Sequence, residues 1–212
     1  GGDKCSYQVP TYEALKGIMR SIYWKPTLVW HIDKVRVLNS IRNESKNIKP
    51  LKMNGGNTLA IYTYLADVKY QVVAHFEWSS YYADETYLAD RLPAKHLEIA
   101  RRMIKKGGRR DIFLGSRECQ GYVEECEFGS GDGAYDDLPE LAFGTMFHGF
   151  DYPDELGQNE FRRRYWRPVM RQGVIEFLPP RECTMTEFVR NMKPVPLKSS
   201  GLQEGSLQYE LA

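Results

Sequence analysis

The sequence predicts an α+β fold, built around a ferredoxin-like unit of the order β-α-β-β-α-β that lacks only its first strand. Two segments show the helical spacing of apolar residues, and three have the composition of strands. Their order along the chain is helix, strand, strand, helix, strand. With 212 residues, 42% of them hydrophobic and 13% aromatic, the chain can bury a core in one domain that carries an appendage.

The first predicted helix covers residues 11–23. Thr11 can cap its N-terminus, and apolar residues recur at helical spacing from Leu15 to Ile22. Pro26 follows directly, and proline cannot continue a helix because it has no N–H to donate. The helix is therefore expected to end before the next segment, which has the character of a strand.

One strand is predicted on each side of a long basic segment. Residues 28–38 are rich in valine and isoleucine, and residues 69–78 alternate between apolar and polar side chains. Residues 39–66, between them, contain the turn signal Gly55-Gly56-Asn57. An insertion of this length in a compact domain is more often functional than idle, so we expect residues 39–66 to have a role.

The second predicted helix begins at Pro93 and stops at Gly107-Gly108. Residues 118–128 then suit the last strand of the unit. Because a strand should also precede the first helix, we expect the natural chain to begin before Gly1.

The composition changes after about residue 130, where glycine, aspartate and proline become frequent. Strand-like pieces at 141–150 and 164–178 predict a small C-terminal β-sheet appendage, and the tail after Lys193 is predicted to be extended. We therefore divide the chain into a ferredoxin-like domain, residues 1–128, and an appendage with its tail, residues 129–212.

Charge is segregated along the chain although its net value is only +1. Residues 91–117 hold nine Lys or Arg against two acids, and further basic runs occupy residues 34–52 and 162–171. Residues 124–140 hold seven carboxylates and no Lys or Arg. Such segregation is expected of a surface that binds a polyanion, although ordinary solvated faces can also produce charge runs.

Several classes of protein are disfavoured. No segment approaches the roughly 18 uninterrupted apolar residues that span a bilayer, and the first residues do not resemble a signal peptide. The four cysteines have no C-x-x-C spacing, so we expect free thiols rather than a zinc site or a disulfide framework. We therefore expect a soluble, cytoplasmic protein that has no membrane contact and binds no metal or cofactor.

Several short segments of the sequence closely resemble the Cas-five subunit of type I-C CRISPR systems, in its "d" or "c" form. This subunit is a member of the RAMP superfamily. The segments are SYQVPTY (6–12), ALKGI (14–18), SIYWKPT (21–27), GGRRDIFLG (107–115), RECQGYV (117–123) and MFHGFDYP (146–153). The resemblance implies a ferredoxin-like, RRM-like domain with an inserted thumb at residues 39–66, a glycine-rich loop and a C-terminal β-sheet. Members of this family carry a further strand before the position of Gly1.

The resemblance also implies an activity and partners. In that family the subunit cleaves pre-crRNA at the base of the repeat hairpin and remains on the crRNA 5′ handle. It joins the backbone and large subunits of the prokaryotic interference complex, Cascade. Contact with target DNA is then expected only through the assembled complex, in a role in antiviral defence.

The family's catalytic set corresponds to Tyr23, Lys95 and His96 in this sequence. Cutting RNA without a metal needs a base for the 2′-hydroxyl, a cation near the phosphorane and an acid for the 5′-oxygen. We hypothesise that His96 moves protons, that Lys95 stabilises phosphorane charge, and that Tyr23 orients or protonates an oxygen. The alternatives are a solvated histidine at a helix start and a tyrosine that belongs to the core.

RNA-binding residues are predicted in two regions. The glycine loop should offer free backbone N–H groups together with two guanidinium groups, although a helix C-cap with exposed arginines is the simpler interpretation. The thumb and one neighbouring loop should contact the RNA backbone. The predicted residues are Gly107, Gly108, Arg109, Arg110, Arg117, Arg42, Lys46 and Lys49.

Two other functions were considered. One is a structural subunit that caps the crRNA 5′ handle without cutting, against which the Lys95-His96 pair argues. The other is a generic RNA-recognition domain, but its aromatic sheet motif is missing from the strand at 69–78. His31 and His148 fall in strand-like segments and are interpreted as structural.

Overall fold

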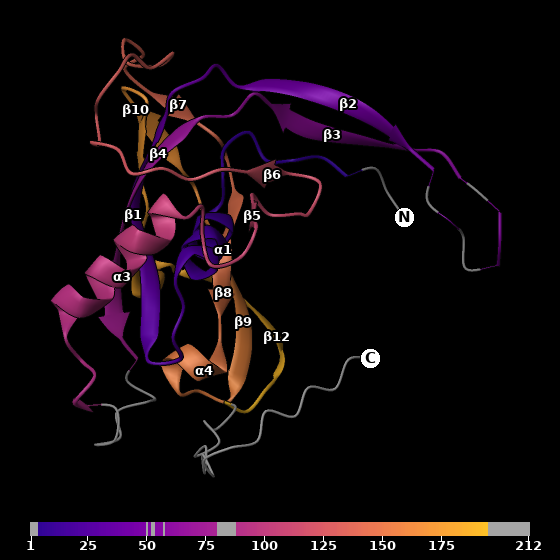
Figure 1. The fold of residues 1–212 in the computed structure, drawn as a ribbon. Coiled ribbons are helices and arrows are strands. Elements are labelled where there is room, and N and C mark those ends of the chain that lie inside the picture. Colours follow the sequence, from indigo (N-terminus) through magenta and orange to yellow (C-terminus); the bar gives the residue numbers. More distant parts are fainter. Residues whose placement is uncertain (1–3, 50, 52–53, 57, 80–87, 195–212) are drawn as a thin grey trace.

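The structure is a computed structural model of the chain and describes residues 4–49, 51, 54–56, 58–79 and 88–194 (Figure 1). It is a mixed α/β fold with mainly antiparallel sheets and few helices. The helices are α1 (Tyr12–Ile22), α3 (Pro93–Lys105) and the short α4 (Pro153–Leu156), with a 3-10 turn at Pro180–Glu182. In these ranges no helix has the length and apolar character needed to cross a bilayer.

In the part of the chain that the structure describes, the strands fall into four sheets. A five-stranded sheet has the order β4-β1-β11-β10-β7, a three-stranded sheet the order β12-β9-β8, and two hairpins pair β2 with β3 and β5 with β6. Their bounds are β1 Leu28–Val37, β2 Arg42–Ile48, β3 Ala60–Ala66, β4 Tyr70–Trp78, β5 Ile112–Phe113, β6 Gln120–Gly121, β7 Leu141–Ala142, β8 Met146–Asp151, β9 Glu160–Trp166, β10 Val169–Arg171, β11 Val174–Glu176 and β12 Met185–Asn191.

The five-stranded sheet contains the two strands predicted at residues 28–38 and 69–78. β1 and β4 pair antiparallel from Leu28 opposite Trp78 to Val37 opposite Tyr70. The other edge of β1 pairs with β11, in which Ile175 lies opposite Val35. Strands from both sides of residue 128 therefore share one sheet, and the division of the chain there stays a prediction. Most of the predicted tail lies outside the described residues.

Within the segment 39–66, strands β2 and β3 form a β-hairpin. Seven residue pairs join β2 to β3 in an antiparallel register, from Arg42 opposite Ala66 to Ile48 opposite Ala60. Figure 1 shows this hairpin projecting from the body at the end remote from α4. The side chains of β2 are almost all exposed, as expected of a strand that packs against only one neighbour.

The predicted strand at 118–128 is wrong over most of its length. Only Gln120–Gly121 is a strand, and it pairs with Ile112–Phe113 rather than with the main sheet. Residues 122–127 have no regular secondary structure, and a turn begins at residue 128. Apolar alternation favours a strand only where a neighbour supplies hydrogen bonds.

Helix α1 lies between two clusters of the core. Its first turns, at Tyr12 and Leu15, pack with residues of both larger sheets, such as Trp166, whereas Ile22 packs with α3 and with the lower half of β1. The predicted cap is confirmed, since Oγ1 of Thr11 accepts from the Ala14 N–H at 3.1 Å. The packing of Ile22 holds the C-terminal end of α1 against α3.

Candidate active site

Tyr23 and His96 are brought together from positions 73 residues apart. Tyr23 is the C-cap residue of α1 and has extended backbone dihedrals, while His96 lies in the first turn of α3. The Tyr23 hydroxyl lies 2.7 Å from Nδ1 of His96. The two side chains are buried, with 7% and 0% exposure. The structure therefore joins two of the three predicted catalytic residues in one hydrogen bond.

The second nitrogen of His96 fixes the direction of that bond. Nε2 lies 2.7 Å from the backbone carbonyl oxygen of Asp90. A carbonyl oxygen can only accept, so in the neutral imidazole Nε2 carries the proton and Nδ1 accepts from the Tyr23 hydroxyl. The rings of Phe76 and Trp78 meet the imidazole edge-on, with centroids 6.3 and 5.2 Å away.

Lys95 contacts neither ring but shares a carboxylate with a second lysine. Nζ of Lys95 lies 2.6 Å from Oδ1 of Asp90, and Nζ of Lys25 bonds to Oδ2 of the same residue. These bonds, first the one from Lys25 and then the one from Lys95, lower the pKa of Asp90 to about 2. The pKa of Tyr23 is raised, mainly by burial and also by the charge of Asp90, so its phenol stays protonated.

Lys25 and Asp90 were missed by sequence analysis. Each is a common residue in a polar segment, and neither forms part of a recognisable motif. The signal that was present is position: Lys25 comes two residues after Tyr23, and Asp90 comes three residues before the first residue of α3.

The glycine loop after α3 corrects one prediction. The N–H of Gly107 donates to Ile104 and that of Gly108 to Met103, at 2.9 and 2.8 Å, while the N–H groups of Arg109 and Arg110 both donate to the Ser21 carbonyl. These backbone N–H groups are therefore not free for a phosphate, because the chain's own carbonyls accept from all four. The side chains of both arginines are exposed, so two guanidinium groups remain available for RNA.

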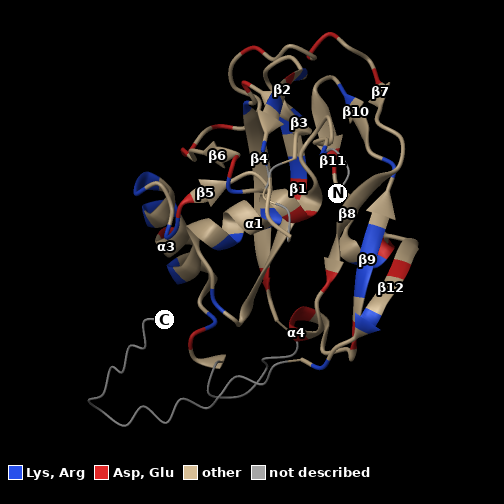
Figure 2. Ribbon diagram, turned by 90° about the vertical axis from the view of Figure 1, so that its right-hand side faces the viewer, with Lys and Arg blue, Asp and Glu red and all other residues tan. Residues whose placement is uncertain are grey.

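One short stretch of chain thus holds both ends of α3. The Ser21 carbonyl accepts from the loop that follows α3, and the Tyr23 hydroxyl bonds to the first turn of α3. Between these points, Arg102 and Lys105 lie exposed on the last turns of the helix. In Figure 2 several positions along the ribbon of α3 are blue, the colour of Lys and Arg.

The remaining predicted RNA-binding residues lie elsewhere. On the hairpin, Arg42 pairs with Asp67 at 3.0 Å, Lys46 pairs with Glu44 at 2.8 Å, and Lys49 is exposed. Arg117 is exposed in the loop between β5 and β6. The three hairpin residues do not lie at the Tyr23–His96 pair, because the hairpin projects from the body well away from the first turn of α3 (Figure 1).

Three arginines of the third basic run lie on β9, and each is paired with a carboxylate. In Figure 2 the blue Lys and Arg positions on the ribbon of β9 lie beside red Asp and Glu positions on β12. Arg162 pairs with Glu160 at 3.0 Å, Arg163 with Glu187 at 3.6 Å, and buried Arg164 with Asp151. Charges that are already paired contribute little to the attraction of a polyanion. The exposed basic residues at the end of α3 are the better candidates.

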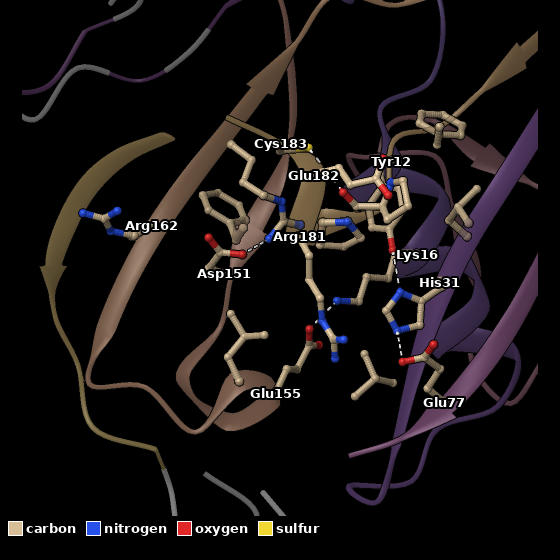
Figure 3. A pocket seen from close by; sticks show the side chains of 18 of the residues that line it. Tyr12, Lys16, His31, Glu77, Asp151, Glu155, Arg162, Arg181, Glu182 and Cys183 are labelled. Atoms are coloured by element: carbon tan, nitrogen blue, oxygen red, sulfur yellow. Dashed lines mark hydrogen bonds and ion pairs between the residues drawn. The ribbon is translucent and has the colours of Figure 1, made fainter. Parts of the chain in front are cut away.

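A cavity of about 860 Å³ lies between β1, β9 and the first turns of α1 (Figure 3). Inside it, Lys16 pairs with Glu155 at 2.5 Å, and the Tyr12 hydroxyl lies 3.3 Å from Nδ1 of His31. Its lining holds five carboxylates against four Lys or Arg, which does not suit a polyanion: Asp33, Glu77, Asp151, Glu155 and Glu182 against Lys16, Arg162, Arg164 and Arg181.

The histidines interpreted as structural lie in strands. His31 belongs to β1 and His148 to β8. His148 is fully buried, stacks on Tyr12 with centroids 4.4 Å apart, and is held at a pKa of about 3 by burial and then by the charge of Arg164. Among the described residues, no three His, Cys, Asp or Glu side chains gather in a group that could hold a metal.

Comparison with known proteins decides the family. The Cas5d family model, described as CRISPR-associated protein (Cas_Cas5), matches residues 1–178. The chain belongs to the Cas5d family. A Cas5d of Mannheimia succiniciproducens, named CRISPR pre-crRNA endoribonuclease, is 29% identical over 208 residues, covering 84% of this chain and 86% of the relative.

Other relatives agree with this assignment. A Cas5d of Thermus thermophilus, with the same name, is 30% identical over 168 residues, which cover 74% of this chain and 69% of the relative. A crystal structure of a CRISPR-associated protein superposes with a TM-score of 0.72 at 36% identity. The uncharacterised protein SMU1763c of Streptococcus mutans superposes with a TM-score of 0.68 at 38% identity. Each alignment covers 86% of this chain and 87% of the solved one.

Proposed function

We propose that this Cas5d chain is the subunit of a type I-C Cascade that cleaves pre-crRNA at the repeat hairpin, without a metal, and stays on the 5′ handle. The names of the curated relatives support the activity. The single observation that carries the chemistry is the Tyr23–His96 hydrogen bond of 2.7 Å. Lys95 directly precedes His96 in the sequence. Phenol, imidazole and ammonium together can supply a hydrogen-bond donor, a proton carrier and a cation.

The reaction is an internal transesterification. The 2′-oxygen forms a new bond to phosphorus and the bond from phosphorus to the 5′-oxygen breaks, which leaves a 2′,3′-cyclic phosphate and a 5′-hydroxyl. One proton leaves the 2′-hydroxyl and one reaches the departing 5′-oxygen, so the net charge does not change. His96 moves protons, Lys95 stabilises the charge on the phosphorane, and Tyr23 donates to an oxygen.

RNA binding is assigned to the surface around this site. The guanidinium groups of Arg109 and Arg110, beyond the end of α3, suit phosphates and unstacked bases of single-stranded RNA. The hairpin, with Arg42, Lys46 and Lys49, would act as the thumb, and Arg117 would extend the path. In this proposal the fold is a ferredoxin-like RAMP domain, and the chain meets the backbone and large subunits of Cascade through the bound handle.

A capping role without cleavage is the second candidate, and one observation favours it. His96 has no exposed surface, and its two nitrogens already bond to Tyr23 and to the Asp90 carbonyl. A proton carrier has to reach the RNA, so a site that stayed closed in this way would bind without cutting. Cleavage therefore requires that RNA binding open the contact with Asp90.

The deciding experiment is cleavage of a labelled cognate repeat hairpin in excess EDTA, with parent protein and the variant His96→Ala. The proposal expects a single cut by the parent that leaves a cyclic phosphate, no cut by the variant, and equal RNA affinity for both. Exposed His75→Ala serves as the control and should cleave like the parent. Tight binding without any cut by the parent would instead establish the capping role.

A further inference from the structure

Two ammonium groups from different elements converge on one carboxylate at the surface of the site. Lys25 follows the end of α1, Lys95 lies in the first turn of α3, and Asp90 precedes that helix. Each lysine bonds to a different oxygen of Asp90. The exposed fractions of these side chains are 36%, 50% and 31%, against 7% for Tyr23 and 0% for His96. The charged trio is therefore much more accessible to solvent than the buried pair.

A carboxylate and a phosphodiester present similar faces to cations. Each carries two anionic oxygens on a single central atom, so each can bridge two ammonium groups at once. The Asp90 carboxylate occupies the position that such a phosphate would take beside Lys25 and Lys95. A phosphate bound there would lie close to His96, because Oδ2 of Asp90 is 3.7 Å from Nε2 of His96.

Asp90 also closes the site through its backbone. Its carbonyl oxygen accepts from Nε2 of His96, the ring nitrogen that does not face Tyr23. A displacement of Asp90 that moves its backbone would therefore free this nitrogen. One residue thus shields both the cations and the imidazole from an incoming RNA strand.

We propose that Lys25 and Lys95 form a two-ammonium subsite for the scissile phosphate, and that Asp90 occupies this subsite until RNA displaces it. The inference rests on the proposed function and deepens it. It assigns a phosphate contact to Lys25 and makes Asp90 a competing occupant of the subsite. It also explains how a site that is closed without RNA becomes accessible.

The test is a double-mutant cycle, in which side-chain substitutions in the protein are combined with removal of one phosphate charge from the RNA. Binding is measured with repeat hairpins that carry a 2′-deoxy nucleotide at the cut, so that no cleavage occurs. One hairpin has a natural phosphate at the cut and the other an uncharged methylphosphonate. The proteins are the parent, Lys25→Ala, Asp90→Ala and Asp90→Asn, with Lys69→Ala as a control at an exposed lysine outside the site.

With the natural phosphate, Lys25→Ala should weaken binding about tenfold, and both Asp90 variants should tighten it by a similar factor. With the methylphosphonate these effects should vanish, and Lys69→Ala should give the same ratio of affinities as the parent. Equal effects on the two hairpins, or Asp90 variants that do not bind the charged hairpin more tightly, would overturn the subsite. Thermal unfolding of each variant identifies any that fails to fold, and Asp90→Asn, which keeps the size of the side chain, then decides.

The outcome separates this inference from the proposed function. The binding cycle uses RNA that is not cleaved, so it can be read even if the parent turns out not to cut. If the parent cuts natural RNA and the cycle shows no coupling, the nuclease function stands and the subsite fails. If the cycle shows coupling and the parent does not cut, the subsite stands as part of a capping protein.

Discussion

The hydroxyl of Tyr23 donates to Nδ1 of His96 across 2.7 Å, and the rings of Phe76 and Trp78 meet the imidazole edge-on. The tautomer follows from the opposite side of the ring, where Nε2 must donate to a carbonyl oxygen. In this arrangement the imidazole is the acceptor and the phenol is the donor. The pair is a hydrogen-bonded unit, and because a phenol has one proton, the Tyr23 hydroxyl can donate to an RNA oxygen only after it leaves Nδ1 of His96.

Removing the donor tests this unit. Tyr23→Phe keeps the ring and its packing but leaves Nδ1 of His96 without a partner. We expect the single-turnover rate of hairpin cleavage to fall by about 10²-fold, a typical contribution of one positioned proton donor. RNA affinity should stay within about twofold, since the side chain is buried and holds no charge.

Tyr122→Phe is the matched control for that variant. The Tyr122 side chain is 94% exposed and lies outside the predicted site, so the loss of its hydroxyl should not change the rate. Equal cleavage by Tyr23→Phe and by the parent would contradict a chemical role for Tyr23 and leave it as a core residue.

Much of the fold could be predicted from local patterns. Helix α1 and strands β1 and β4 agree with the predicted segments to within a few residues, because burial of one face imposes a clear periodicity. The strand predicted at 118–128 failed because pairing is a tertiary property that no local pattern encodes. For the same reason the sequence did not indicate that β11 pairs with β1.

The site was predicted in part. Tyr23, Lys95 and His96 came from a family resemblance, and the structure brings the first and the last into one hydrogen bond. The carboxylate that joins Lys25 to Lys95 has no signal in the sequence, since ion pairs between distant segments depend on the fold. The prediction of free N–H groups in the glycine loop was wrong, because the Ser21 carbonyl accepts from two of them.

The glycine loop gives a prediction about stability. Gly108 has φ +107°, and a Cβ placed there would lie 2.8 Å from the Arg110 carbonyl oxygen, whereas a Cβ on Gly107, at φ +81°, meets nothing within 4 Å. Gly107→Ala should cost about 1 kcal/mol, the usual penalty for a left-handed residue. Gly108→Ala should cost about 2–4 kcal/mol because steric overlap adds to that penalty. Urea unfolding measures both, and equal losses would contradict the close approach at Gly108.

The two arginines beyond the loop give a prediction about binding. The double variant Arg109→Ala and Arg110→Ala should lower RNA affinity and reduce the slope of log affinity against log salt by about 1.4, or about 0.7 for each phosphate contact. The matched control is Arg162→Ala with Arg163→Ala, whose guanidinium groups are paired with carboxylates on β9 and β12. An unchanged slope for the first double variant would mean that the loop makes no phosphate contact.

The last prediction concerns the dependence of stability on pH, through His148. Its Nε2 lies 2.9 Å from the Leu178 carbonyl oxygen, and burial followed by Arg164 holds its pKa at about 3, below the ordinary value of 6.5. Between these values the unfolded chain binds a proton that the folded chain does not. This contribution to stability is therefore fully present above pH 6.5 and is lost as the pH falls towards 3.

From about pH 7.5 to 5.5, this single group should lower the free energy of unfolding by about 1.4 kcal/mol. His148→Gln retains a donor for the Leu178 carbonyl but cannot titrate, so its unfolding free energy should fall by about 1.4 kcal/mol less over that interval. His75→Gln removes a histidine from an exposed position on β4 and serves as the control. Urea unfolding of all three proteins at both pH values measures the difference. If His148→Gln lost stability as steeply as the parent, the folded protein would bind a proton at His148 as readily as the unfolded chain does.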